Sequence, residues 1–304
     1  MINKQEKLTK VKLKGNESFN IREGWLRKGI RCVQDCPTLF SRDDAMEILG
    51  VGSKMVKSIR YWLRATGLTE ERAPVGRARE QILTERFGEV IDQYDRYFDD
   101  VFTLFLLHYN IVKNSEGLSV AWDIFFNNYD GQDFTKENMI EKCKEELNKR
   151  LAEGATFSES LFADDCASIL RMYNTTDVAE DPEESLSCPL IELGLIRKSA
   201  NKNGTYVKTP PARDLLDKMA VLYVILDNIE EGKESVSIES LISDANNIGK
   251  VFNLDRVLIN EYLDQLRVSG YITLNRTAGL DMMYVNDNRT PEGVMREYYE
   301  KRMR

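Results

Sequence analysis

The sequence is poorest in histidine, because its 304 residues include only one, His108. Ser-His-Asp hydrolases, histidine-metal nucleases and two-histidine zinc hydrolases all need imidazoles that this chain lacks. The sequence also lacks a GxxxxGK(S/T) loop and a GxGxxG motif after a strand. A P-loop ATPase and a dinucleotide site are therefore unsupported, and we expect no nucleotide or flavin cofactor. The apolar neighbours of His108 predict a core histidine that is hydrogen-bonded to a neighbour.

Long apolar segments and a secretory signal are lacking as well. The longest apolar run, at 101–107, is far below the roughly 18 residues of a membrane span. No apolar segment follows the first seven residues, so a cytoplasmic protein without membrane association is expected. Of the five cysteines, only Cys32 and Cys36 lie close together, and no second pair completes a zinc site. We expect reduced structural thiols.

Charge is distributed unevenly along the chain, whose net charge is −8. Residues 1–80 carry 17 Lys and Arg against 10 Asp and Glu, a net charge of +7. The rest of the chain carries 25 basic and 40 acidic side chains, a net charge of −15. A polyanion responds to the local field, so the basic N-terminal region indicates double-stranded DNA as a partner. A merely solvated basic face is the alternative interpretation.

The segment 41–68 has the pattern of a helix-turn-helix. Ser41 is expected to cap the first helix, with two acidic residues in its first turn. The residues at 50–52 supply a tight turn, and Ser53 is expected to cap the second helix. Gly67 follows as a left-handed stop signal. The segment therefore predicts two helices joined by a tight turn, as in a DNA-binding helix-turn-helix.

The second of these helices has two faces of different character. Met55, Val56, Ile59 and Leu63 recur at helical spacing and predict an anchoring apolar stripe. The opposite face offers hydrogen-bond donors that suit phosphates or base edges in a major groove. These expected DNA-binding residues are Lys54, Lys57, Ser58, Tyr61 and Arg64, with Arg60 near the edge of the face. A helical hairpin that serves only as scaffold is the competing interpretation.

The remaining pattern predicts a mainly α fold with small β-hairpins and three domains. These are a basic helix-turn-helix domain at 1–80, a helical middle domain at 81–190 and a winged-helix-like domain at 191–304. Segment by segment, we expect a mobile basic arm or first strand at 1–14, a linker or exposed basic loop at 72–80, helices over 81–152 with breaks near 114–117 and 128–132, a helix at 157–173 and an acidic loop at 174–189.

Two hairpins are expected late in the chain. The strands 195–198 and 205–208 flank a polar Asn-Gly turn, and the strands 271–274 and 282–285 flank a turn with a glycine. The second hairpin follows helical patterns at 237–245 and 254–268, an order typical of a winged helix. The latter helix has a mixed charge that phosphate disfavours, so this module is expected to be structural or to bind protein.

Two groups of side chains could support phosphodiester chemistry. Asp164 and Asp165 precede Arg171 on one predicted helix, where successive residues point about 100° apart. Only one aspartate can face Arg171, and a salt bridge is the simplest interpretation. Glu17, beside Asn16, is the second candidate. With histidine scarce, the chemistry left is general-base catalysis with a basic clamp or a carboxylate-held divalent metal, Mg²⁺ or Mn²⁺. A structural role competes for both groups.

Short motifs over nearly the whole chain form a recognisable set. They are GNESF at 15–19, REGWLRKG at 22–29, FSRDDA at 40–45, LGVGSKMV at 49–56, IRYW at 59–62, LHY at 107–109, AW at 121–122, LRMY at 170–173, CPLIELGLI at 188–196, GKVFNL at 249–254 and TAGL at 277–280. The set resembles an SspB-like bacterial family, long catalogued as a domain of unknown function.

The resemblance implies a component of a DNA phosphorothioate modification system that acts in anti-phage defence. It implies that the chain binds duplex DNA and nicks one strand, with a cysteine desulfurase, an ATPase and an ATP-pyrophosphatase-like protein as partners. The matching signature positions Glu17, Arg22, Trp25 and Lys28 are carried over, and Arg27 lies among them. The family pattern leads us to expect histidine where this chain has Asn16. Either other residues act here, or nicking is reduced.

Two other functions fit the same pattern. A non-catalytic adaptor would bind DNA through its N-terminal domain and recruit the sulfur-transfer enzymes through its acidic body, and the scarcity of histidine favours it. A transcriptional regulator with two winged helices would explain the helix-turn-helix but would leave the middle region without a role. The regulator is expected to dimerise and to bind a palindromic operator.

Overall fold

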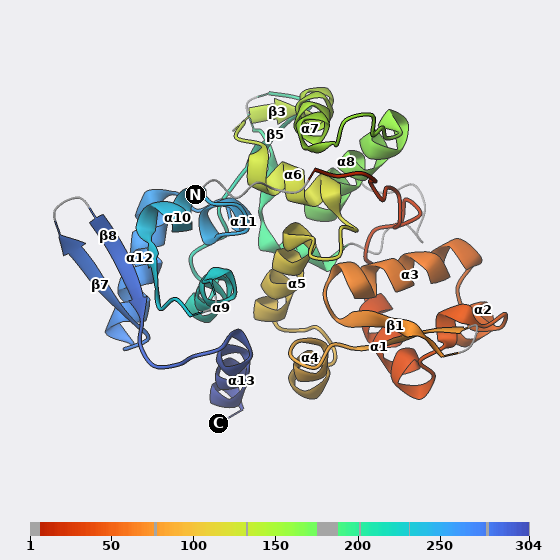
Figure 1. Cartoon of the computed structure of the whole chain (residues 1–304), viewed down its shortest axis with the longest axis horizontal. Coiled ribbons are helices and arrows are strands. Elements are labelled where there is room, and N and C mark those ends of the chain that lie inside the picture. Colours follow the sequence, from red (N-terminus) through yellow and green to blue (C-terminus); the bar gives the residue numbers. More distant parts are fainter. Residues whose placement is uncertain are drawn as a thin grey trace.

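The computed structural model of this chain describes residues 7–75, 78–131, 133–174, 188–200, 202–230, 232–277 and 280–303. Helices predominate, and the sheets in these ranges are small and antiparallel. Figure 1 shows the N-terminal elements at one end, α5 to α8 in the centre and the C-terminal elements at the other end. One continuous apolar core runs through all three regions. No helix in the described ranges has the length and apolarity to cross a membrane.

The N-terminal region is a set of short helices followed by a hairpin. Trp25, Leu26, Ile30 and Val33 form the buried face of the first helix, which packs on α3. The expected linker at 72–80 is wrong, because most of it pairs as two antiparallel strands. The elements are α1 (Trp25–Asp35), the 3-10 helix η1 (Leu39–Ser41), α2 (Ala45–Leu49), α3 (Ser53–Ala65), β1 (Thr69–Val75) and β2 (Ala78–Leu83).

The turn glycines were predicted correctly, but the caps were not. Gly50 and Gly67 adopt left-handed φ angles of 59° and 74°, which glycine tolerates without steric cost. Ser41 belongs to η1, and its hydroxyl donates to the Arg79 carbonyl of the hairpin, so it caps no helix. The cap positions fall instead at Asp44 and Gly52. The Ser41 side chain, which the local pattern assigned to a helix cap, is thus hydrogen-bonded to the hairpin instead.

The middle region is mostly helical, as predicted, and α5 packs on α6 within it. His108 on α5 is fully buried between the Tyr173 hydroxyl, 2.7 Å from Nδ1, and the Val251 carbonyl, 2.8 Å from Nε2. Burial lowers its pKa to about 3, which confirms a neutral core histidine. The elements are α4 (Gly88–Tyr94), α5 (Val101–Lys113), α6 (Val120–Asn128), β3 (Asp133–Thr135), α7 (Lys136–Arg150) and α8 (Glu159–Tyr173).

The C-terminal region contains both predicted hairpins, each extended by a third strand from elsewhere in the chain. β3 joins the first hairpin in the order β3-β5-β4, and β6 joins the second in the order β6-β8-β7. The elements are η2 (Pro189–Leu193), β4 (Ile196–Lys198), β5 (Thr205–Lys208), α9 (Lys218–Asn228), β6 (Ser235–Ser237), α10 (Ile238–Ser243), α11 (Ile248–Val251), α12 (Arg256–Val268), β7 (Ile272–Thr277), β8 (Leu280–Val285) and α13 (Pro291–Arg302).

The sequence analysis did not anticipate three α-helices of this region, α9, α11 and α13. α11 is a single turn between the two predicted helices, and α13 packs against both α9 and α4. The three-domain division stays a prediction, although its limits at residues 80 and 190 fall inside β2 and η2. Most of the predicted acidic loop at 174–189 lies outside the described residues.

Candidate functional site

A strained turn at residues 14–18 forms the centre of the candidate site. Lys14, Glu17 and Ser18 have φ angles of 55°, 49° and 67°. These lie in the left-handed region, which residues other than glycine rarely adopt. The Glu17 and Phe19 amides donate to the carbonyls of Lys14 and Asn16, which closes two successive tight turns. Such strain persists only where surrounding contacts hold it, and it concentrates at functional sites.

Helix α8 supplies those contacts from 150 residues further along the chain. The Lys14 amide donates to the Asp165 carboxylate over 3.0 Å, and the Lys14 ammonium donates to Asp164 over 2.7 Å. Asn16 is buried, its Nδ2 lies 3.3 Å from Ser168 Oγ, and its Oδ1 accepts the Ser18 amide. The 14–18 turn is therefore fixed on α8 by its own backbone and side chains.

Helix α3 covers the other side of the turn. A Cβ at Gly15 would lie 2.4 Å from the Tyr61 ring, so only glycine permits this approach. The Tyr61 hydroxyl donates to the Leu118 carbonyl, while Ser58 Oγ and Trp62 Nε1 both donate to the Phe19 carbonyl. Burial raises the pKa of Tyr61 well above its usual value, and nearby Asp165 adds to the effect. The tyrosine is a neutral packing group.

The expectation that Ser58 and Tyr61 face DNA is therefore wrong, since both are buried. The helical pattern alone placed them on a polar face. In the folded protein α1 covers one side of α3, and the segment around the 14–18 turn covers another. Trp62 also meets Trp122 of α6 edge-on, with ring centroids 5.5 Å apart. Only the N-terminal half of α3 remains open, and it exposes Lys54 and Lys57.

All three expected catalytic residues lie around the 14–18 turn. Glu17 is 30% exposed and its carboxylate lies 3.6 Å from the Lys57 ammonium. Asp165 is buried and holds the Lys14 amide. Arg171 donates to Ser168 Oγ over 2.7 Å, the same oxygen that Asn16 approaches. Tertiary structure thus unites two groups of candidates that the sequence analysis treated separately.

The two aspartates of α8 differ in their electrostatics. Burial raises the pKa of Asp165 to about 6, although the Lys14 amide partly opposes the shift. Asp164 is half exposed, and its hydrogen bond with Lys14 raises the pKa of that lysine. A buried carboxylate that accepts a backbone amide cannot reach a solvent-side substrate. We therefore assign Asp165 to positioning of the turn, and Glu17 is the accessible carboxylate among the predicted catalytic residues.

The basic residues further along α3 are engaged with acidic partners. Arg60 Nε donates to Glu71 over 3.0 Å, and Arg64 lies 2.9 Å from the same carboxylate while it also pairs with Glu116. Burial acts to raise the pKa of Glu71, but the arginines, with Arg79, lower it overall. Both guanidinium groups therefore support the β1 hairpin, and DNA would have to compete with Glu71 to contact them.

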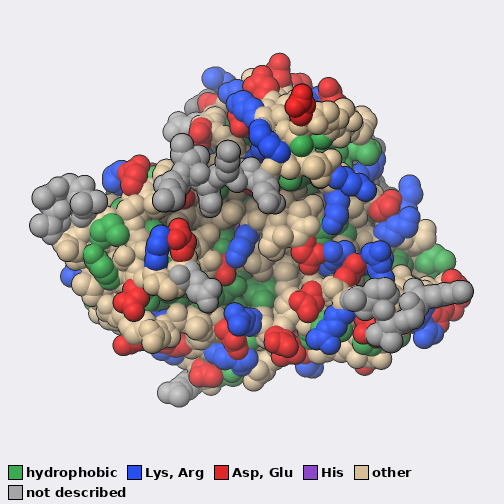
Figure 2. All heavy atoms as spheres, in the orientation of Figure 1, with side chains coloured by type: hydrophobic (Ala, Val, Ile, Leu, Met, Phe, Trp, Pro, Cys, Tyr) green, Lys and Arg blue, Asp and Glu red, His purple; other side chains and the backbone are tan. Residues whose placement is uncertain are grey.

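The expected DNA-binding residues at 22–28 are partly committed to packing. Arg22 stacks over the Phe19 and Trp25 rings at 5.6 and 5.3 Å, and Trp25 is buried. Arg27 is exposed and lies 3.9 Å from the Tyr97 ring centroid, while Lys28 donates to the Leu49 carbonyl at the end of α2. Figure 2 shows Lys and Arg side chains interspersed with Asp and Glu on the flank that carries α3 and α8.

Sequence reasoning missed the role of Ser168. Its spacing from Asp164 and Arg171, four and three residues, places all three on one face of α8 and was a usable signal. Its contact with Asn16 had no local signal. Within the described ranges, no three His, Cys, Asp or Glu side chains are grouped so that they could hold a metal ion. The described residues therefore do not form a metal centre by themselves.

Fold and site together define a mainly helical protein whose basic N-terminal region presents a charged, strained turn on a central helical body. The chain belongs to the family described as "Protein of unknown function (DUF4007)", whose model matches residues 13–299, and it is an SspB-like member of it. It is similar to a solved structure titled "Magnesium ion-bound SspB crystal structure", with 25% identity, a TM-score of 0.81 and coverage of 96% of both chains. A second, "SspB crystal structure", has 26% identity, a TM-score of 0.81 and coverage of 96% of this chain and 87% of that chain. No curated protein matches.

Proposed function

We propose that this protein binds duplex DNA and nicks one strand as part of a DNA phosphorothioate modification system in anti-phage defence. Its proposed partners are a cysteine desulfurase, an ATPase and an ATP-pyrophosphatase-like protein. Membership of an SspB-like family supports this proposal. The single observation that carries it is the 14–18 turn, where Glu17 meets Lys57 of α3 and lies beside the α8 residues that hold Arg171.

DNA contact is assigned to the N-terminal half of α3. In a helix-turn-helix, the N-terminal residues of the second helix enter the major groove. Here those residues include Lys54 and Lys57, both exposed, and α2 precedes them across the Gly50 turn. The β1–β2 hairpin follows α3 in the position of a wing. The cationic side chains would bind phosphates, which accounts for affinity, and the helix would read the groove.

Glu17 is the proposed general base for strand cleavage. A water molecule held by Glu17 would attack phosphorus and transfer one proton to the carboxylate. The new bond joins the water oxygen to phosphorus, and the bond from phosphorus to one deoxyribose oxygen breaks. That oxygen leaves with the electron pair and takes a proton from solvent. Lys57 and Arg171 would stabilise the negative charge that builds on the phosphate oxygens.

A divalent metal is the proposed helper, Mg²⁺ or Mn²⁺, and one of the similar SspB structures is titled as magnesium-bound. Because the described residues lack a preformed group of three ligands, the ion would need DNA phosphate oxygens to complete its shell. Magnesium commonly binds in this way, through one or two carboxylates, water and substrate phosphates. When bound, it would supply additional charge stabilisation.

The C-terminal module is assigned to protein contacts. The element order β6, α10, α11, α12, β7, β8 supports the proposal of a winged-helix-like module. α12 exposes two valines, Val257 at 64% and Val268 at 79%, which lie eleven residues apart and hence on one face. An exposed apolar face with acidic neighbours suits a protein partner better than phosphate.

The test is a supercoiled-plasmid assay with and without Mg²⁺ or Mn²⁺, scored by open-circle product. The variant Glu17→Gln should lose nicking while it keeps DNA binding. Glu23→Gln removes the same charge from an exposed position in the neighbouring segment and is the matched control. Unchanged nicking by Glu17→Gln, with full binding, would exclude Glu17 as the base.

A non-catalytic DNA-binding adaptor is the second candidate. It is favoured by Asn16, which occupies the position where histidine was expected. Asn16 is buried, and its side-chain amide is hydrogen-bonded to Ser168 Oγ and to the Ser18 amide. It therefore cannot replace a catalytic imidazole. Tight DNA binding without open-circle product, even after the partner proteins are added, would favour the adaptor.

A further inference from the structure

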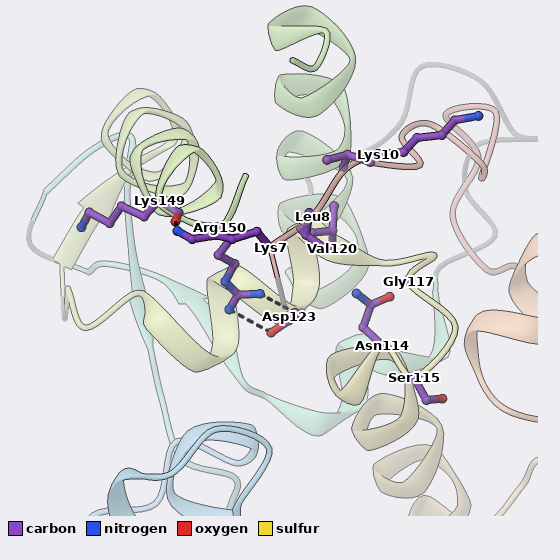
Figure 3. A pocket seen from close by; sticks show the side chains of 11 residues that line it. Lys7, Leu8, Lys10, Asn114, Ser115, Gly117, Val120, Asp123, Lys149 and Arg150 are labelled. Atoms are coloured by element: carbon purple, nitrogen blue, oxygen red, sulfur yellow. Dashed lines mark hydrogen bonds and ion pairs between the residues drawn. The ribbon is translucent and has the colours of Figure 1, made fainter. Parts of the chain in front are cut away.

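The N-terminal arm forms one wall of a cavity away from the 14–18 turn. Residues 7–11 run beside the loop between α5 and α6 and the end of α7, and they enclose about 420 Å³ (Figure 3). The Leu8 amide donates to the Arg150 carbonyl over 2.8 Å, and the Lys7 ammonium donates to the Lys149 carbonyl. The arm is therefore held in place here, and we call this cavity the arm groove.

The arm groove is strongly basic. Its lining contains Lys7, Lys10, Lys149 and Arg150 against one acid, Asp123. Arg150 pairs with Asp123 over 2.7 Å, and Figure 3 shows this pair together with Lys10 and Lys149 projecting outward on opposite sides. Lys149 also pairs with Glu146, but this ion pair lies at the surface, where such pairs contribute little free energy. Cations at the edges suit an extended polyanion that crosses the groove better than a small enclosed anion.

The start of α6 adds a second attraction for phosphate. Val120, the first residue of this nine-residue helix, lines the groove. Among the described residues, neither its amide nor that of Ala121 has a hydrogen-bond acceptor, and Ser119 makes no side-chain cap. Free amides and the helix dipole give a helix N-terminus a partial positive charge.

The groove also lies near the candidate site along the chain. Lys10 and Lys14 are four residues apart, so their Cα atoms are at most about 14 Å from each other. One DNA strand carries a phosphate for roughly every 3.4 Å of helix axis. DNA whose phosphate lies at the 14–18 turn would therefore present another phosphate to the groove within about four nucleotides.

We propose that the arm groove is a second DNA contact, which binds the sugar-phosphate backbone beside the nicked position through Lys10, Lys149 and the start of α6. This assignment rests on the proposed DNA-binding function. It implies that the DNA backbone runs from the groove to the 14–18 turn and is bound at both places. This contact is additional to the one made by α3. The arm would set how much flanking DNA the protein needs.

The test compares two doubly neutralised variants of the full chain. Lys10→Gln with Lys149→Gln alters the groove, and Lys136→Gln with Lys142→Gln removes the same charge from α7 outside it. DNA affinity is measured by fluorescence anisotropy on one duplex between 50 and 200 mM salt. The slope of log K against log salt is negative, and each lost phosphate contact reduces its magnitude by about 0.9. The groove variant should lose about 1.8 from the slope and the control should lose none.

The outcomes separate this inference from the proposed function. An unchanged slope in the groove variant, while Lys57→Ala still lowers it, overturns the groove contact and leaves DNA binding by α3 in place. Wild-type protein with no salt-dependent DNA binding overturns both. Pyrophosphate binding that is lost in the groove variant, together with an unchanged DNA slope, overturns the backbone contact and assigns the groove to a free anion. Circular dichroism checks that both variants are folded.

Discussion

Gly15 and Tyr61 lie in such close contact that a methyl group on residue 15 would come within 2.4 Å of the tyrosine ring. The contact joins the turn that carries Glu17 to the helix that carries Lys57. Tyr61 cannot move away freely, because its ring is buried and its hydroxyl is bonded to the Leu118 carbonyl. The position of Glu17 relative to Lys57 therefore depends on a glycine at position 15.

Gly15→Ala should destabilise the protein by about 1–3 kcal/mol, the usual cost of overpacking a closely packed site. Chemical denaturation measures the change. Gly52→Ala is the matched control, since the described atoms leave the space around a Cβ there open and its φ is negative. Equal stability of the two variants would contradict the close approach. We also expect Gly15→Ala to nick DNA more weakly than its stability alone explains.

Ser168→Ala should disturb the turn, because Ser168 Oγ lies between Asn16 and Arg171. The variant leaves a buried amide group without this partner, which costs about 1–3 kcal/mol of stability. If nicking occurs, kcat should fall more than KM rises, since Arg171 is expected to act on the charge of the transition state. Ser160→Ala, at the exposed start of α8, is the control. A loss of stability with kcat intact would make Ser168 purely structural.

Asp165 should make stability depend on pH between about 4 and 6. Burial raises its folded-state pKa to about 6, against about 3.9 in an unfolded chain. The folded state then binds more protons in this window, so this group's contribution to stability falls as pH rises through it. Asp165→Asn keeps an acceptor for the Lys14 amide and should remove the effect. The variant should gain about 1–3 kcal/mol relative to wild type between pH 4 and 7.

Urea denaturation of both proteins at several pH values measures this difference. A constant difference between wild type and Asp165→Asn across the range would show that Asp165 titrates normally. Glu159→Gln is the control, because this carboxylate at the start of α8 is exposed and pairs with Lys144 at the surface. We expect that variant to follow the wild-type dependence in this window closely.

Lys57→Ala should weaken DNA affinity and reduce the slope of its salt dependence by about 1, as expected for one phosphate contact. Adding Arg60→Ala should change the slope less, because Arg60 is already paired with Glu71. Anisotropy titrations over a range of salt concentrations measure both. If neither variant changes the affinity or the slope, α3 is not the DNA-contacting helix.

Local patterns in the sequence determined much of the architecture. The apolar stripe of Val56, Ile59 and Leu63 is buried as its spacing predicts, and Gly50 and Gly67 mark real left-handed turns. Both late hairpins and the buried, neutral His108 were also predictable. These features follow from helix and strand periodicity and from turn chemistry, which act over a few residues.

Tertiary structure alone decided which polar side chains are available. Ser58 and Tyr61 share a helical face with Lys57 in the sequence pattern, yet they are buried under the segment around the 14–18 turn. That turn takes its conformation from α8, which lies about 150 residues away in the chain. Helical periodicity assigns a residue to a face, but the elements that pack on that face are specified elsewhere in the sequence. The union of Glu17, Lys57 and Arg171 at one turn is therefore a consequence of long-range packing, which no local pattern encodes.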